Sequence, residues 1–213
     1  FIFDYSKKLE IVAKGLQIFN DSRTIGEIDF LLNDKQNKKI IQLEVAVKYY
    51  LGTDSDAEWS KWIGPNGADN LERKIDKFAV QLTMAGFVNS EILTKDTLVS
   101  PKILLKGYLF RHLNNSRLSA FCSPTVLNGT WIYHNEAEQI INPKNNYAII
   151  PKNRWLSFYI DKKIKIVSGK KIGKVLDEAV FKIGKGILLA EIDHSGRRIV
   201  EKYMVVPNNW PDL

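Results

Sequence analysis

The amino-acid sequence predicts an α/β fold, and three observations support that class. Segments rich in β-branched and aromatic residues alternate with segments whose apolar residues recur every three to four positions. The hydrophobic share of 45% and the charged share of 26% are typical of a soluble globular protein. No apolar run reaches the ~18 residues that a membrane helix requires, so we expect no membrane partner.

Residues 1–111 are expected to form the core, in the order helix, three strands, helix, strand. Leu9, Val12 and Ala13 share one side of a helix that is expected to end before Gly15. Runs of apolar and β-branched residues between turn signals predict strands at residues 16–20, 25–32, 39–51 and 101–111. Four apolar residues on one face predict a helix over residues 69–85: Leu71, Ile75, Phe78 and Leu82.

Residues 112–213 are expected to form a C-terminal α+β elaboration of the same domain or a small second lobe. Short strands are predicted at residues 130–133 and 147–150, with a short helix over 136–141 between them. A longer helix is predicted over residues 170–183. A closing hairpin is predicted at residues 186–192 and 198–206.

The charge balance favours a polyanionic partner but leaves a second explanation open. The chain has 31 basic and 24 acidic residues, a net charge of +7 and a pI near 9.3. A basic surface binds phosphates with release of counterions. Alternatively, the excess lysine reflects an AT-biased genome and the charges are spread evenly.

The single Cys122 excludes a disulfide framework and fits the cytoplasm. We expect a chain that begins at Phe1 to be part of a longer protein.

Two carboxylates are expected to face each other across the second and third strands. In a hairpin symmetric about Gln36 and Asn37, Asp29 lies directly opposite Glu44 on the same face of the sheet. Carboxylates that close repel each other unless a cation lies between them, and Mg²⁺ is commonly held by one or two carboxylates plus phosphate. Alternatively, both side chains face solvent and are neutralised by Lys48 and the lysines of the turn.

The other candidate residues carry weaker signals. Lys74 and Gln81 lie on the flank of the apolar face of the predicted helix, so they are expected to point partly toward the sheet. Trp59 and Trp62 either form a wall against nucleic-acid bases or pack beneath a loop. The three histidines are far apart without metal-ligand spacing and are expected to be structural or exposed: His112, His134 and His194.

These residues resemble the motifs of the PD-(D/E)xK phosphodiesterase superfamily, which includes restriction endonucleases. The segment 26–30, Gly-Glu-Ile-Asp-Phe, is similar to the second-strand motif whose Asp is a metal ligand. The segment 42–48 is similar to the third-strand motif that carries a metal-binding Glu and a Lys. More closely, the chain resembles a bacterial family of uncharacterised function placed in that superfamily, through residues 24–32, 43–51, 62–66 and 205–211.

The resemblance implies a restriction-endonuclease-like core and a metal-dependent phosphodiesterase, a nuclease that acts on DNA. Asp29 and Glu44 would then hold Mg²⁺ or Mn²⁺, while Lys48 positions or polarises the attacking water. Five further residues are candidates to contact the substrate or to orient the metal ligands: Glu27, Gln42, Asn66, Lys74 and Gln81.

The sequence departs from the superfamily pattern in two places. The superfamily places its Lys two residues after the Glu, where this chain has Ala46. Many members also carry a metal-binding Glu on the first helix, for which Glu10 lies too close to Asp29. An inactive nuclease fold that binds nucleic acid or another protein is therefore the alternative.

Overall fold

The computed structural model describes residues 8–53, 58–89, 91–94, 96–114 and 126–212. The protein is a mixed α/β structure that is rich in strands and has few helices. It divides into two compact units, and we describe each by itself. Unit 1 comprises residues 1–47 and 73–106, and unit 2 comprises residues 48–72 and 107–213. Residues 48–72, which the sequence groups with the N-terminal core, thus belong with the C-terminal half.

Unit 1 is built on an antiparallel meander. The meander consists of β1 (Leu9–Asn20), β2 (Arg23–Asp34) and the first part of β3 (Lys39–Gly52). β5 (Val99–His112), whose first part belongs to unit 1, follows β3 in the strand order. The Asp34 carboxylate shapes the turn between β2 and β3, because its Oδ1 accepts hydrogen bonds from the backbone amides of Gln36 and Asn37. Lys38 completes that turn with a φ of 49°.

The expected N-terminal helix is wrong over the residues that the structure describes. Residues 9–20 form β1, while residues 4–7 of the predicted helix lie outside the described part of the chain. Partly buried and exposed residues alternate from Leu9 to Lys14, which is the period of a strand. Gly15 ends no helix: it lies within β1 with a φ of 56°.

The helix of unit 1 is shorter than predicted. Helix α1 runs over Leu71–Gln81, and a 3₁₀ turn, η3, follows at Met84–Phe87. Only the part of α1 from Arg73 onward belongs to unit 1, where Phe78 is 1% exposed. The apolar core of unit 1 lies between the strands and η3 and contains Ile18, Ile28, Leu31, Met84 and Leu93.

Unit 2 contains a mixed sheet. Its strand order is β3-β5-β6-β10-β9-β7-β8, with β4 on β3; β6 runs parallel to β5 and to β10, and the pairings of β7, β8 and β9 are antiparallel. The strands that lie wholly in unit 2 are β4 (Trp62–Ile63), β6 (Leu127–Tyr133), β7 (Asn146–Ile150), β8 (Val167–Ser168), β9 (Ile187–Ile192) and β10 (Ile199–Val206). Gly107 lets β5 approach β3, because a Cβ there would lie 1.6 Å from the carbonyl oxygen of Lys48.

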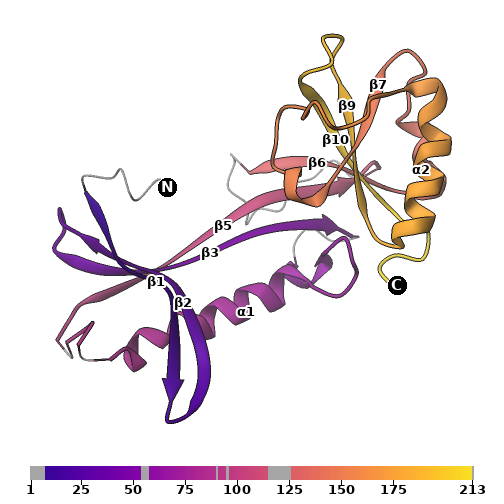
Figure 1. Ribbon diagram of the computed structural model, residues 1–213. Helices are drawn as coiled ribbons and strands as arrows, with labels where there is room; N and C mark the ends of the chain where they lie inside the picture. The colour runs from indigo at the N-terminus through magenta and orange to yellow at the C-terminus, as the bar shows by residue number, and fades with distance from the viewer. Residues whose placement is uncertain (1–7, 54–57, 90, 95, 115–125, 213) are drawn as a thin grey trace. The chain divides into compact units, whose positions relative to one another are not determined.

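The helices of unit 2 are α2 (Gly169–Ile183) and short 3₁₀ segments: η2 (Trp59–Lys61), η4 (His134–Gln139) and η5 (Lys152–Arg154). Helix α2 lies along the sheet beside β7 and β9 (Figure 1). It ends at Gly184, whose φ is 62°. The predicted α2 is confirmed within one residue, whereas the short helix expected over residues 136–141 is a 3₁₀ helix that begins two residues earlier.

Two large apolar clusters form most of the core of unit 2. One packs α2 against the sheet through Ile172, Leu176 and Val180. The other is rich in aromatic residues and includes Tyr108, Phe110, Trp131, Trp155 and Trp210. Among the described residues, no helix is long and apolar enough to cross a membrane.

Candidate functional site

The register of β2 on β3 is the one that the sequence predicts. The ladder is that of a hairpin symmetric about Gln36 and Asn37, and it runs from the pair Asp34–Lys39 to the pair Phe30–Leu43. Asp29 and Glu44 come next. There the Asp29 side chain takes the place of a backbone partner, because its Oδ2 accepts a hydrogen bond of 2.7 Å from the Val45 amide. The regular ladder therefore ends where the two carboxylates begin.

Glu44 is fully buried, with 0% of its surface exposed. Its Oε1 accepts a hydrogen bond of 3.0 Å from Gln42 Nε2, while its Oε2 has no hydrogen-bond donor among the described residues. Burial raises the pKa of the Glu44 carboxyl, and the negative charge of Asp29 raises it further. The Gln42 hydrogen bond and the positive charge of Lys74 oppose that rise in the pKa without cancelling it.

Two glutamines place more oxygen atoms in the same unit. Gln42 is 0% exposed, and its Nε2 donates a second hydrogen bond, of 2.7 Å, to the backbone carbonyl of Gln81. The side-chain oxygens Gln42 Oε1 and Gln81 Oε1 are buried without a donor in the described parts of the chain. With Glu44 Oε2, three buried oxygen acceptors lack a donor, and each such group costs about 1–3 kcal/mol.

Helix α1 carries the basic side chain of this region. Lys74, Phe78 and Gln81 follow the helical spacing i, i+4, i+7, so they lie on one face of α1. The Lys74 Nζ lies 3.6 Å from the centroid of the Phe78 ring, a cation–π contact. We call Asp29, Gln42, Glu44, Lys74 and Gln81 the carboxylate site.

The remaining predicted residues are not part of the carboxylate site. Lys48 belongs to unit 2, where its Nζ lies 2.5 Å from Asp69 Oδ2. Asn66 is exposed in a turn of unit 2, and Glu27 is exposed on β2 opposite Gln17 of β1. The burial of Glu44 contradicts the alternative in which both carboxylates face solvent and are neutralised by Lys48.

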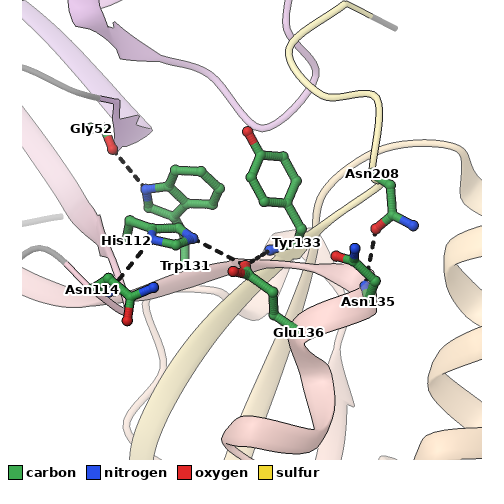
Figure 2. Close-up of polar contacts among 8 residues, drawn as sticks. All are labelled: Gly52, His112, Asn114, Trp131, Tyr133, Asn135, Glu136 and Asn208. Atoms are coloured by element: carbon green, nitrogen blue, oxygen red, sulfur yellow. Dashed lines mark hydrogen bonds and ion pairs between the residues drawn. The ribbon is translucent and has the colours of Figure 1, made fainter.

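Two of the histidines bind carboxylates of the same unit. Figure 2 shows His112 joined to Glu136, with 3.0 Å between Nε2 and Oε2. The same Glu136 oxygen accepts a hydrogen bond from the Tyr133 amide, which fixes the start of η4. His134 is bound to Asp177 of α2 at 2.8 Å. These contacts connect η4 to β5 and to α2.

The remaining candidates from the sequence are the two tryptophans and the cysteine. Trp62 is fully buried and packs with Tyr50 and Leu109, whereas Trp59 is 36% exposed. Cys122 lies outside the described residues. Within the described ranges, no group of three or more His, Cys, Asp or Glu side chains comes together as a metal site.

Sequence reasoning missed a buried lysine in unit 2. Lys202 is 4% exposed, and its Nζ donates hydrogen bonds to Trp155 O at 2.7 Å and Tyr108 Oη at 3.1 Å. Burial lowers the pKa of Lys202 to about 8. The signal was present: strand alternation places Lys202 on the face of β10 that carries the buried Met204 and Val206.

The comparison with protein families places the chain in a family. The model of a domain of unknown function, DUF1853, matches residues 1–206. No curated protein and no solved structure matches the chain. Because the family model spans nearly all of its 213 residues, the protein belongs to the DUF1853 family.

Proposed function

We propose that the carboxylate site binds a divalent cation through Asp29 and Glu44, and that the protein is a metal-dependent nuclease that hydrolyses DNA. One observation carries the proposal. Three buried oxygen acceptors, on Gln42, Glu44 and Gln81, have no donor in the described part of the chain, and they share unit 1 with a second carboxylate, Asp29, whose charge acts on Glu44. A bound cation would satisfy these acceptors and offset the repulsion between the two carboxylates.

The donor set suits a hard cation. Every candidate ligand atom is an oxygen, from a carboxylate or an amide, which is the chemistry that Mg²⁺ and Mn²⁺ prefer. Mg²⁺ commonly takes only one or two protein carboxylates and completes its shell with water and substrate phosphate. Two carboxylates are therefore enough, although the described residues include no cluster of three acidic or histidine ligands.

The chain's own residues would hold and orient the ligands. The Val45 amide fixes one oxygen of Asp29, and Gln42 fixes one oxygen of Glu44. Both carboxylates are thus restrained before any ligand arrives, which lowers the cost of ordering them. A bound Mg²⁺ would supply Lewis acidity and an activated water for attack on a phosphodiester. The net charge of +7 and the resemblance to nuclease motifs support DNA as the substrate.

A binding module without hydrolysis is the second candidate. Two observations favour it: Ala46 stands where the resembling superfamily has its lysine, and Lys48 is bound to Asp69 in unit 2. Such a module would bind metal and DNA without cleaving the DNA. Metal binding therefore tests the site, and cleavage distinguishes the two functions.

The experiment is a calorimetric titration of the purified chain with Mn²⁺ and with Mg²⁺. Asp29→Asn and Glu44→Gln should each weaken binding by at least about 100-fold, since each removes one of two charged ligands. Asp34→Asn is the matched control, because Asp34 is a buried carboxylate of the same strand that serves the hairpin turn. Circular dichroism verifies that each variant is folded.

The outcomes separate clearly. Metal binding that is absent in the wild type, or unchanged in both Asp29→Asn and Glu44→Gln, would overturn the metal site. Incubation of plasmid and linear DNA with the metal-loaded protein tests hydrolysis. Metal binding without cleavage of any DNA, under conditions in which the protein binds DNA, would favour the binding module.

A further inference from the structure

We infer that unit 2 carries a surface that binds single-stranded nucleic acid, with a base stacked on Tyr159 and phosphates on the basic side chains around it. The surface is formed by residues 158–165 and by residues 193–198, which join β9 to β10, and we call it the Tyr159 surface. The inference goes beyond the proposed function, because the Tyr159 surface needs neither the carboxylate site nor a metal ion.

Backbone hydrogen bonds hold the two segments of the Tyr159 surface side by side. Two of them, of 2.8 and 2.9 Å, join residues 158–160 to residues 197–199. Between these two bonds, Tyr159 and Arg198 form an antiparallel bridge. The Cα atoms of such a non-hydrogen-bonded pair are only about 4.5 Å apart, and both side chains project from the same face. The Tyr159 ring and the Arg198 guanidinium therefore start from neighbouring positions on one face.

The Tyr159 side chain lies on the face that points away from the core of unit 2. Its two neighbours along the chain lie on the opposite face: Ile160 packs against the aromatic core cluster, and the Phe158 ring centroid lies 5.3 Å from the buried Lys202 Nζ. Tyr159 itself is 67% exposed. Its backbone is held by Ser157 Oγ, which donates to the Tyr159 carbonyl at 2.6 Å and accepts from its amide at 3.2 Å. An exposed ring on a restrained backbone suits the stacking of a base.

The Tyr159 surface is strongly basic. Its two segments contain five lysines and arginines but only two acidic residues. All five basic side chains are exposed, and none of them has an ion-pair partner among the described residues. They are Lys162, Lys163, Lys165, Arg197 and Arg198. Their charges are therefore available to an anionic partner.

A tight turn places two of the lysines close to Tyr159. The Ile164 amide donates to the Asp161 carbonyl at 2.9 Å, which closes a β-turn. Lys162 and Lys163 are its two central residues. This turn begins two residues after Tyr159, so both ammonium groups are within reach of a strand whose base stacks on the ring.

The other basic residues belong to the adjacent β9–β10 turn or run beside it. Arg197 and Arg198 end that turn, and their amides donate to Asp193 Oδ1 at 3.0 and 3.1 Å. The isoleucine that follows Lys165 lies 3.6 Å from the position that a Cβ would take at Gly196. The segment that carries Lys165 is therefore packed against the β9–β10 turn.

The two acidic residues of the Tyr159 surface serve its turns. Asp161 Oδ2 accepts a hydrogen bond of 3.1 Å from Arg154 Nη2, and the two side chains form an ion pair. Asp193 accepts a hydrogen bond of 2.8 Å from the Ser195 hydroxyl in addition to those from the turn backbone. Both carboxylates thus hold the backbone in place and leave the five basic side chains unpaired, which favours a polyanion.

The combination of ring and charge favours a single strand over a duplex. Phosphates attract lysine and arginine in either form of nucleic acid. A protein ring can stack only on a base whose face is uncovered, which single strands offer and the interior of a duplex does not. Exposed Tyr159 within a basic surface therefore fits single-stranded nucleic acid.

The test measures the binding of a fluorescein-labelled oligo(dT) of about 16 nucleotides by fluorescence anisotropy. EDTA is present, so that neither metal binding nor cleavage contributes. We expect Tyr159→Leu to weaken binding by about fivefold or more, because it removes the ring and keeps an apolar side chain, whereas Tyr159→Phe should bind within about twofold of the wild type. Phe181→Leu is the matched control, since Phe181 is a 92% exposed aromatic residue of α2 in the same unit. This control should also bind within about twofold of the wild type.

The salt dependence of binding separates charge from stacking. Lys162→Ala combined with Lys163→Ala should reduce the slope of log Kobs against log salt concentration by about 1.4, since each phosphate contact of a single strand contributes about 0.7. Tyr159→Leu should weaken binding without changing that slope. The matched control is Lys182→Ala combined with Lys185→Ala, which removes two exposed lysines at the C-terminal end of α2 and should leave the slope unchanged.

Three outcomes would overturn the inference, with circular dichroism verifying that each variant is folded. They are no binding of oligo(dT) by the wild type at ~50 mM salt, unchanged binding in Tyr159→Leu, and an equal loss of binding in Phe181→Leu. Tyr159→Leu should bind a duplex of the same length as tightly as the wild type does, and a loss there as large as with oligo(dT) would also overturn it. A wild type that binds oligo(dT) but no Mn²⁺ would overturn the proposed function and support this inference.

Discussion

Glu44 is a buried charged side chain of unit 1 and Lys202 is one of unit 2, and the surroundings of the two side chains differ. Glu44 in unit 1 is 0% exposed and Lys202 in unit 2 is 4% exposed. Burial shifts the pKa of both toward the neutral form, raising it for the acid and lowering it for the base. The difference lies in their hydrogen bonds, because the Lys202 ammonium donates two hydrogen bonds, whereas Glu44 Oε2 has no donor among the described residues.

The environment of Lys202 is that of a structural group. Its Nζ connects β10 to Trp155 and to Tyr108 of β5, and it lies 4.2 Å from the centroid of the Tyr108 ring. Trp155 and Tyr108 both belong to the aromatic cluster of the core. A buried lysine whose donors are satisfied stabilises the packing of the segments that it connects.

The environment of Glu44 supports the proposal that it binds a ligand. Its unsatisfied oxygen, and those of Gln42 and Gln81, lower the stability of unit 1 with no structural return in the described residues. Such a cost is characteristic of sites that are completed by a ligand. The comparison therefore predicts that changes at Lys202 affect folding alone, while changes at Glu44 affect ligand binding first.

The largest effect on stability is expected from Lys202. Its folded-state pKa of about 8 lies below the ordinary lysine pKa of 10.5, so the unfolded chain binds more protons between these values and stability rises with pH across that window. The two values differ by roughly 2.5 pH units, which corresponds to about 3 kcal/mol. Urea denaturation at pH 8 and pH 10 should show most of this gain in the wild type and none of it in Lys202→Met.

Comparing the wild type with Lys202→Met also cancels the contribution of other titrating groups to the pH dependence of stability. Burial raises the pKa of Tyr49 to about 12, so tyrosines lower stability only when the pH rises above about 10. The difference between wild type and Lys202→Met cancels that effect. An equal pH dependence in the two proteins would show that Lys202 is solvated in the folded state.

A slightly smaller effect is expected when metal is added. A ligand present at 100 times its Kd stabilises the folded state by about 2.7 kcal/mol. Mn²⁺ at that level should raise the free energy of unfolding of the wild type and of Lys202→Met equally, and should leave Glu44→Gln unchanged. Thermal denaturation with and without EDTA measures the difference. An equal gain in Glu44→Gln would place the metal elsewhere.

The sequence predicted the parts of the fold that depend on local signals. The register of β2 on β3, observed from Asp34–Lys39 to Phe30–Leu43, follows from the turn residues between the two strands, and the turn is stabilised by Asp34 within it. Helix α2 follows from an apolar period that holds over 15 residues. The prediction of the first helix failed because Leu9, Val12 and Ala13 fit the period of a helix while Leu9, Ile11 and Ala13 fit that of a strand. Pairing with β2 decides between the two periods.

The parts that failed depend on distant contacts. The sequence left open whether the polar face of β3 is exposed; in the structure Gln42 and Glu44 are buried, and Gln42 binds a carbonyl 39 residues further along the chain. Lys48 and Asp69 come together across 21 residues, which no strand pattern reveals. The roles of Asp29, Glu44 and the metal remain predictions that the experiments above test.

Without metal, Glu44→Gln should stabilise the protein at neutral pH. The folded-state pKa of Glu44 is raised, so its contribution to stability is complete below the unfolded value near 4.5 and is lost as the pH rises through the folded value. Glutamine has no such loss. Denaturation in EDTA at pH 4 and pH 8 should show a higher free energy of unfolding for Glu44→Gln than for the wild type only at pH 8. A variant that is less stable at pH 8 would mean that the wild-type carboxylate is satisfied within the fold.

The smallest effect on stability is expected at the exposed contact between His134 and Asp177 in unit 2. Asp177, which binds His134, is 66% exposed, so water screens the pair and Asp177→Asn should change the free energy of unfolding by less than about 0.5 kcal/mol. The matched pair is His112–Glu136, whose side chains are both 20% exposed. Glu136→Ala should cost about 1 kcal/mol or more, because it also removes the acceptor of the Tyr133 amide at the start of η4. Equal changes in the free energy of unfolding for the two variants would show that hydrogen bonding and burial do not determine how much a charged side chain contributes to stability in this protein. The contrast between Lys202 and Glu44 would then lose its physical basis.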